Sequence, residues 1–120
     1  MDISQRIAEL KQRPDFARHV GMILVHNGVV RQWSRQDGSP VSAVEVRMDM
    51  GVAEGIRQEM LARPGIYEIL IEANQGRLLP GDDLLFLVVA GDLRENVKPV
   101  LADLLDRIKA EAVSKREIIG

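Results

Sequence analysis

The chain has 120 residues, of which 46% are apolar, so we predict one domain over residues 1–120 with a single core. Sixteen basic and eighteen acidic residues give a formal net charge of −2, which provides no general attraction for nucleic acid or an anionic membrane. The lack of cysteine excludes disulfides and thiolate metal sites, and with two histidines we expect no metal and no cofactor. No segment approaches the roughly 18 apolar residues of a membrane span, so we expect a cytoplasmic protein.

The first half of the chain predicts one helix and two strands. Residues 3–12 have the apolar spacing of a short peripheral helix, which Pro14 ends. The continuous apolar run over residues 20–30 predicts a strand buried on both faces. Residues 41–49 alternate apolar and charged side chains, as a half-exposed strand does. An Asp-Gly turn lies between the two strands, and we expect them to pair as a hairpin.

The second half predicts two helices and two further strands. Residues 51–65 have helical spacing and end at Pro-Gly, while residues 66–73 alternate as a strand. The apolar run over residues 84–92 predicts a buried strand, and residues 94–112 carry an apolar stripe at the spacing of a long helix. The order of these elements predicts an α+β fold with a mostly antiparallel sheet and flanking helices.

Several chemical groupings are better explained by structure than by function. The chain contains no nucleophile elbow, phosphate-binding loop or dinucleotide fingerprint. His19 and His26 are seven residues apart, which is more typical of incidental histidines than of a metal site. Trp33 stands between Arg31 and Arg35, but aromatic residues make up only 3% of the chain, too few for a nucleic-acid stacking surface.

Two features could carry chemistry. Arg31 follows a predicted strand end, where a guanidinium can bind a phosphate or carboxylate, or can simply be the first exposed residue. Lys109 and Lys115 lie at the end of the long helix, where they form either a site or an ordinary cationic helix terminus. Six residues of ideal helix turn through about 600°, so the two lysines converge only if the helix ends between them.

Three segments, in the same order along the chain, carry a resemblance to a known family. They are "GMILVHNGVVR", "GRLLPGDDLLFLVVAG" and "LRENVKPVLADLLDRIKAEAVSKRE". Together they resemble the large, catalytic subunit of molybdopterin synthase, an enzyme of molybdenum cofactor biosynthesis. The resemblance implies a hammerhead-like α+β fold and a homodimer that binds two copies of a small ubiquitin-like sulfur carrier. The carrier's C-terminal Gly-Gly thiocarboxylate is expected to transfer sulfur to cyclic pyranopterin monophosphate.

The resemblance also implies a role for four side chains. Lys109 matches the essential lysine of the family and Lys115 its second active-site lysine, while Arg31 and Arg94 match arginines that bind the anionic substrate. The family commonly has a histidine at the positions of Leu93 and Ala73, and this departure leaves two further interpretations open. In the first, the chain is a non-catalytic relative that binds a carrier tail or an anionic metabolite as an adaptor or regulator. In the second, the similarity to the family is coincidental.

Overall fold

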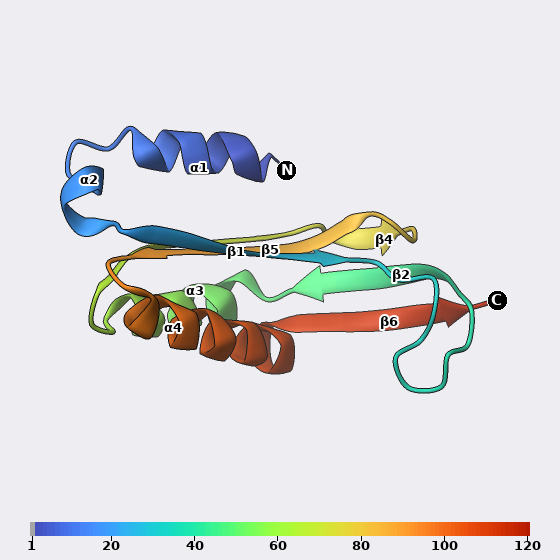
Figure 1. The fold of residues 1–120 in the computed structure, drawn as a ribbon. Coiled ribbons are helices and arrows are strands. Elements are labelled where there is room, and N and C mark those ends of the chain that lie inside the picture. Colours follow the sequence, from blue (N-terminus) through green and yellow to red (C-terminus); the bar gives the residue numbers. More distant parts are fainter. Residues whose placement is uncertain (1) are drawn as a thin grey trace.

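The computed structural model describes residues 2–120 and contains two three-stranded antiparallel sheets with helices packed against the first sheet (Figure 1). The helices and strands follow each other in this order: α1 (Ile3–Lys11), α2 (Phe16–His19), β1 (Met22–Val29), β2 (Val41–Met48), α3 (Met50–Leu61), β3 (Ile66–Ala73), β4 (Gly76–Leu78), β5 (Asp83–Gly91), α4 (Arg94–Arg107), a π-helical turn (Ile108–Ala112) and β6 (Val113–Ile119).

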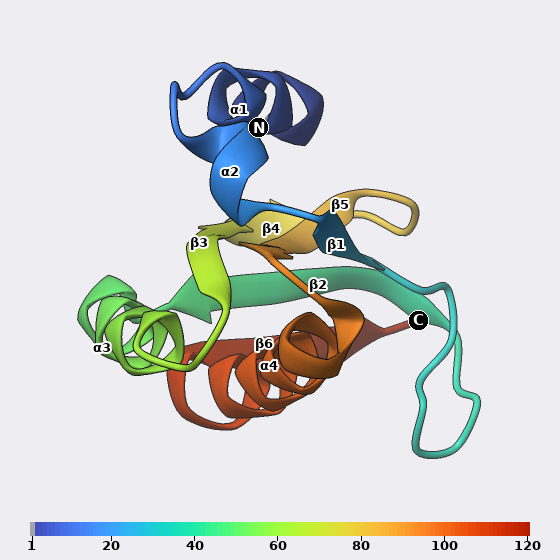
Figure 2. The ribbon, with the colours of Figure 1, turned by 60° about the vertical axis from the view of Figure 1, so that its left-hand side comes forward.

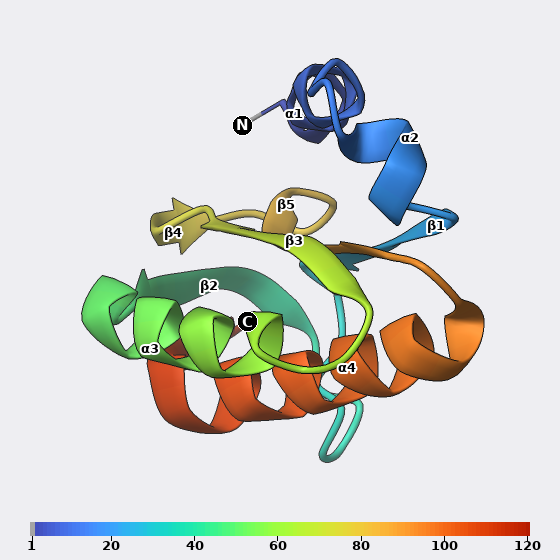
Figure 3. The ribbon, with the colours of Figure 1, turned by 90° about the vertical axis from the view of Figure 1, so that its left-hand side faces the viewer.

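The first sheet has the order β1-β5-β3, and both pairings are antiparallel. β5 is central, and its residues from Leu84 to Gly91 are all buried. Leu85, Leu87 and Val89 face the main core, whereas Phe86 and Val88 face the side on which α1 lies (Figures 2 and 3). The continuous apolar sequence of this strand therefore reflects a central strand that is buried on both faces.

Helices α3 and α4 cover the inner face of the first sheet (Figure 3). The predicted apolar stripe of α4 is confirmed: Val97, Val100 and Leu104 are at most 1% exposed, and Ile108 continues the stripe into the π-helical turn. Burying such side chains stabilises the fold by roughly 1.5–3 kcal/mol each. The stripe thereby fixes the position of the chain just before Lys109.

The second sheet has the order β4-β2-β6, and its pairings are also antiparallel. It extends the molecule beyond the ends of α3 and α4, to overall extents of 50 × 25 × 25 Å (Figure 1). β2 lies between its two neighbours, and Val44 and Val46 from its buried face join the same core as the first sheet. The α+β class and the antiparallel pairing predicted from the sequence are confirmed.

Two predictions about β1 are wrong. β1 does not pair with β2 but with β5, and residues 30–40 carry the chain from one sheet to the other. β1 is also not buried on both faces, because Val25 and Val29 are 44% and 48% exposed. β1 lies at the edge of its sheet, and a run of aliphatic residues does not distinguish an edge strand from a central one.

Two strands were not predicted. β4 has three residues, too few for an alternating pattern to be recognised. β6 follows directly on the π-helical turn, and its sequence VSKREII carries four consecutive polar or charged residues, which are typical of a helix terminus. By contrast, β3 has the bounds expected from its alternation, and α1 ends one residue earlier than expected.

Candidate functional site

A cavity of about 480 Å³ lies where the inner face of β1, the end of α4 and β6 meet the loop of residues 31–40. Its charged lining consists of four cations and one carboxylate: Arg31, Arg35, Lys109, Lys115 and Glu117. His26, Gly28 and Leu85 contribute from the first sheet. The cavity is thus strongly cationic although the chain as a whole carries a net charge of −2.

Lys109 is positioned by the π-helical turn that ends α4. Ile108 and Ala112 of this turn are 0% and 6% exposed, so both are anchored in the core. The backbone N–H of Asp49 donates a hydrogen bond of 2.8 Å to the carbonyl oxygen of Ala112, which holds the end of the turn. Single π-helical turns are frequent at functional sites. Here the turn directs Lys109 to the cavity while Ile108 and Ala112 stay buried.

Lys115 reaches the same cavity from β6. In the β2–β6 ladder, Lys115 lies opposite Val46 and Glu117 opposite Val44, and both valines are buried. Lys115 and Glu117 therefore share the inner face of β6, whereas Arg116 points to the other face and pairs with Glu45 at 2.7 Å. The helix does end between the two lysines, and this change of structure brings them together.

The environment of Lys115 disfavours its charged form. Partial burial in the cavity lowers the pKa of Lys115, and the nearby charges of Arg31 and Lys109 lower it further. Glu117 acts in the opposite direction but does not cancel these effects. A lysine in this environment gives up its proton more readily than one in water. An anionic ligand in the cavity would stabilise its charged form.

Arg31 enters the cavity from the end of β1. The β1–β5 register shifts between Gly28 and Val29, and such a bulge redirects the side chains that follow. The central carbon of the Arg31 guanidinium lies 4.9 Å from the ring centroid of Trp33, within the range of a cation–π interaction. This contact with Trp33 favours the orientation in which the Arg31 guanidinium lies over the ring.

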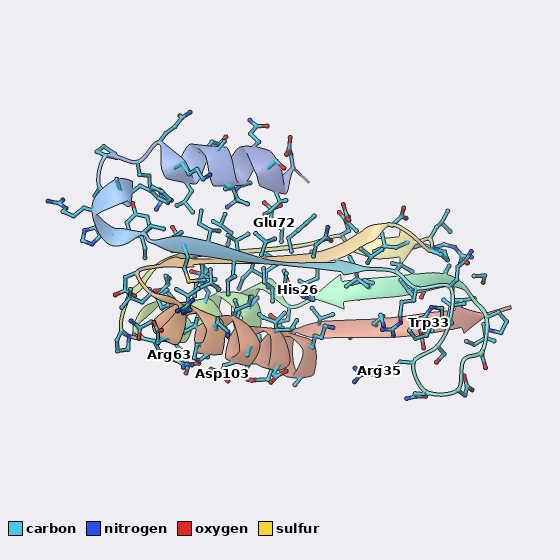
Figure 4. All side chains as sticks on the ribbon, viewed as in Figure 1. His26, Trp33, Arg35, Arg63, Glu72 and Asp103 are labelled. Carbon is cyan, nitrogen blue, oxygen red and sulfur yellow. The ribbon has the colours of Figure 1, made fainter. Side chains whose placement is uncertain are left out.

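The loop of residues 31–40 adds a second arginine that the sequence did not single out as a site residue. Arg35 lines the cavity and extends from the loop toward the end of α4 (Figure 4). The Ser34 hydroxyl donates a hydrogen bond of 3.1 Å to Glu117, which ties the loop to β6. Arg35 was not recognised because only the closed loop brings it back to the cavity.

Arg94 is not part of this cavity within one chain. It lies at the first residue of α4, its side chain is 77% exposed, and it pairs with Glu95 at 3.5 Å. Fifteen residues separate it from Lys109, which corresponds to about 22 Å along a helix. Of the four predicted site residues, the structure thus brings together Arg31, Lys109 and Lys115.

Within residues 2–120, no group of three or more metal-binding side chains is found. The same residues include no helix with the length and apolar character needed to cross a membrane. The groups available for chemistry in the cavity are therefore cations, one carboxylate and the imidazole of His26. Such a set can bind anions, stabilise developing negative charge and transfer protons.

The fold and the cavity define an α+β protein with a cationic pocket. Residues 1–111 match the family described as MoaE protein. A probable molybdopterin synthase from Haloferax volcanii is 31% identical over 104 residues, covering 82% of this chain. The match covers 40% of that relative, so the chain spans less than half of its length.

Solved structures share the fold. The molybdopterin synthase from Staphylococcus aureus superimposes with a TM-score of 0.81 at 20% identity, covering 100% of this chain and 86% of that one. A complex of subunits 1 and 2 of molybdopterin-converting factor from Helicobacter pylori gives 0.70 at 16% identity, covering 97% and 78%. The chain belongs to the MoaE family, that of the large subunit of molybdopterin synthase.

Proposed function

We propose that this protein acts in molybdenum cofactor biosynthesis as the large subunit of a molybdopterin synthase. In this role it transfers sulfur from the C-terminal thiocarboxylate of a small carrier protein to cyclic pyranopterin monophosphate. The observation that supports this most directly is the meeting of Lys109, Lys115 and Arg31 in one cavity, which they reach from the π-helical turn, β6 and the end of β1.

The charge of the cavity suits these substrates. The phosphate of the pterin and the thiocarboxylate of the carrier are both anions, and they repel each other in water. A cavity with four cations and one carboxylate brings the two anions together and offsets that repulsion. The negative charge that develops during sulfur transfer is stabilised by the same fixed groups.

Each side chain has a role in the proposed reaction that follows from whether it can change its protonation state. Lys109 donates or accepts a proton, or stabilises the negative charge that develops as sulfur attacks. Lys115 holds the substrate or the thiocarboxylate. Arg31 stays charged throughout and binds the phosphate with its guanidinium, which Trp33 keeps in place.

Partner proteins complete the proposed enzyme. We expect a small ubiquitin-like carrier subunit that ends in Gly-Gly, and the two-subunit complex from Helicobacter pylori supports such a partner. We also expect a homodimer of the present chain. Arg94 lies outside the cavity of its own chain, so its expected substrate-binding role requires that it enter the cavity of the second copy.

The test is conversion of cyclic pyranopterin monophosphate by the purified chain mixed with its thiocarboxylated carrier. We expect molybdopterin to form, and carrier that ends in an ordinary carboxylate to give none. Absence of product with a correctly folded pair would contradict the proposed activity.

A non-catalytic function remains as the second candidate because Leu93 and Ala73 stand where the family resemblance implies histidines. An adaptor would bind the carrier tail or an anionic metabolite in the same cavity without sulfur transfer. Carrier binding that depends on Lys109 and Arg31, together with no product, would favour this function.

A further inference from the structure

His26 is a half-buried histidine that lines the cavity and that the proposed function does not use. It lies in β1 opposite Leu87 of β5, on the face that points to the core, and Figure 4 shows it between the two sheets. The neighbouring residue on the same face is Gly28. A Cβ atom at Gly28 would lie 3.2 Å from Nε2 of His26, which is a tight contact. The glycine therefore leaves room for the imidazole at the cavity wall.

The Nε2 atom of His26 is buried and has no hydrogen-bond partner among the residues that the structure describes. An unpaired buried polar atom costs about 1–3 kcal/mol, and such atoms are uncommon in native proteins. A nitrogen of this kind in the wall of a binding cavity gains a partner when a ligand with oxygen atoms enters.

Burial and the surrounding charges disfavour the protonated form of the His26 imidazole. Burial lowers the pKa of His26, and the positive charge of Lys109 lowers it further. The neighbouring strand β5 contributes only leucines to the surroundings of His26. The charged groups around it come from the loop, the π-helical turn and β6, and they are Arg31, Arg35, Lys109, Lys115 and Glu117. Cations dominate, so an additional charge on the imidazole is unfavourable until an anion arrives.

We propose that His26 is a further binding residue of this cavity, and that its imidazole takes up a proton from solvent when an anionic ligand is bound. The inference rests on the proposed function for the identity of the natural anion, which is the phosphate or the thiocarboxylate. The anion offsets the surrounding cations, so that the imidazolium becomes favourable and donates a hydrogen bond to the ligand. No other bond is formed or broken.

Thermodynamic linkage gives the measurable consequence. If binding of the anion promotes protonation of His26, then protonation promotes binding of the anion by the same factor. The affinity of the cavity for an anion should therefore rise as the pH falls through the titration range of histidine.

Sulfate is a suitable probe because its own charge stays constant from about pH 5 to pH 8, where histidine titrates. Calorimetry at matched ionic strength is expected to show sulfate binding about tenfold tighter at the lower end of this range. His26→Gln should bind with less than about twofold pH dependence. His19→Gln is the matched control, because His19 is exposed on α2, outside the cavity, and this variant should behave as the wild type.

A second measurement needs no variant. In wild-type protein, the NMR titration of the His26 ring protons should move to higher pH when sulfate is present, while that of His19 should not. An unchanged His26 titration at saturating sulfate, a pH dependence that survives in His26→Gln, or no sulfate binding would each overturn the inference. Neither measurement involves the carrier, so the result is independent of whether sulfur transfer occurs.

Discussion

Lys115 lies directly opposite Val46 in the β2–β6 ladder, and Val46 has no exposed surface. The lysine is therefore held on the inner face of an edge strand, where an apolar residue would be the usual occupant. This register, together with the π-helical turn that carries Lys109, places two ammonium groups in one cavity. Strand register determines the site as much as the identity of the lysines does.

Replacing Lys109 by alanine should abolish activity with little effect on folding. Lys109 is exposed and has no ion-pair partner among the described residues, whereas its ammonium faces the anions of the proposed reaction. We expect sulfur transfer to fall by about a hundredfold or more, and the unfolding midpoint to change by less than about 2 °C. Product formation and thermal unfolding measure the two effects.

Lys98→Ala is the control for this experiment, because Lys98 is exposed on the same helix but lies outside the cavity. It should retain full activity. Equal activity of the Lys109→Ala and Lys98→Ala variants would rule out the role proposed for Lys109.

The sequence was informative where a residue pattern is local. The stripe from Val97 to Ile108 and the alternation in β3 depend on near neighbours in the chain, and both were predicted correctly. The pairing of β1 with β5 joins residues about sixty positions apart, and no local pattern specifies it. The alternation of β6 cannot be recognised in its sequence, because Arg116 on one face and Lys115 and Glu117 on the other are all charged.

The same distinction applies to the site. Arg31, Lys109 and Lys115 stood out in the sequence as candidate site residues, but only the family resemblance assigned them to one site, because spacing carries no long-range information. His26 and Arg35 entered the cavity only through tertiary structure: one lies on the inner face of an edge strand and the other on a loop that folds back. Their side chains gave no sequence signal that separates them from incidental residues.

Anion binding should weaken at alkaline pH because of Lys115. The pKa of Lys115 lies below the ordinary value of 10.5, so its ammonium loses its proton earlier than a lysine in water does. Sulfate affinity should therefore decline as the pH rises through this lowered pKa, and Lys115→Gln should lack this decline. An alkaline decline of the same size in both proteins would assign it to another group.

The stability effect of Lys115 has the opposite sign. Between the lowered pKa of the folded state and the ordinary pKa of the unfolded state, the unfolded chain binds more protons, so stability rises with pH. At neutral pH the charged Lys115 is therefore unfavourable to the fold, and Lys115→Gln should unfold at the same temperature or a higher one. Thermal unfolding at neutral pH checks this, and a clear loss of stability would contradict it.

Removing the indole of Trp33 should weaken anion binding moderately. The ring is 53% exposed and lies against the Arg31 guanidinium, an arrangement worth roughly 0.5–1 kcal/mol. Trp33→Leu is thus expected to weaken sulfate binding by about two- to fivefold, measured by calorimetry at one pH. Trp33→Phe keeps an aromatic face and should lose less, so equal losses in both variants would argue against this contact.

Two glycines give a matched test of the packing around the first sheet. A Cβ atom at Gly91 would lie 2.5 Å from the carbonyl oxygen of Gly65 and 2.6 Å from Val97, whereas one at Gly55 would meet nothing within 4 Å. Gly91→Ala should therefore destabilise the protein by about 1–3 kcal/mol. Gly55→Ala, in the exposed face of α3, should stabilise it by about 0.5–1 kcal/mol. Denaturant unfolding measures both, and equal effects would contradict the close approach at Gly91.

The position of Arg94 predicts that two copies of the chain build each site. The exposed Arg94 side chain stands at the opposite end of α4 from Lys109, so its expected substrate-binding role requires the cavity of a second copy. Arg94→Ala and Lys109→Ala homodimers should then both be nearly inactive. A heterodimer of these two variants, isolated through two different tags, contains one intact site out of two and should show about half of wild-type activity. An inactive heterodimer would place both residues in the same site of one chain. Full activity of the Arg94→Ala homodimer would exclude Arg94 from the site, because a residue that binds the substrate phosphate cannot be lost without effect.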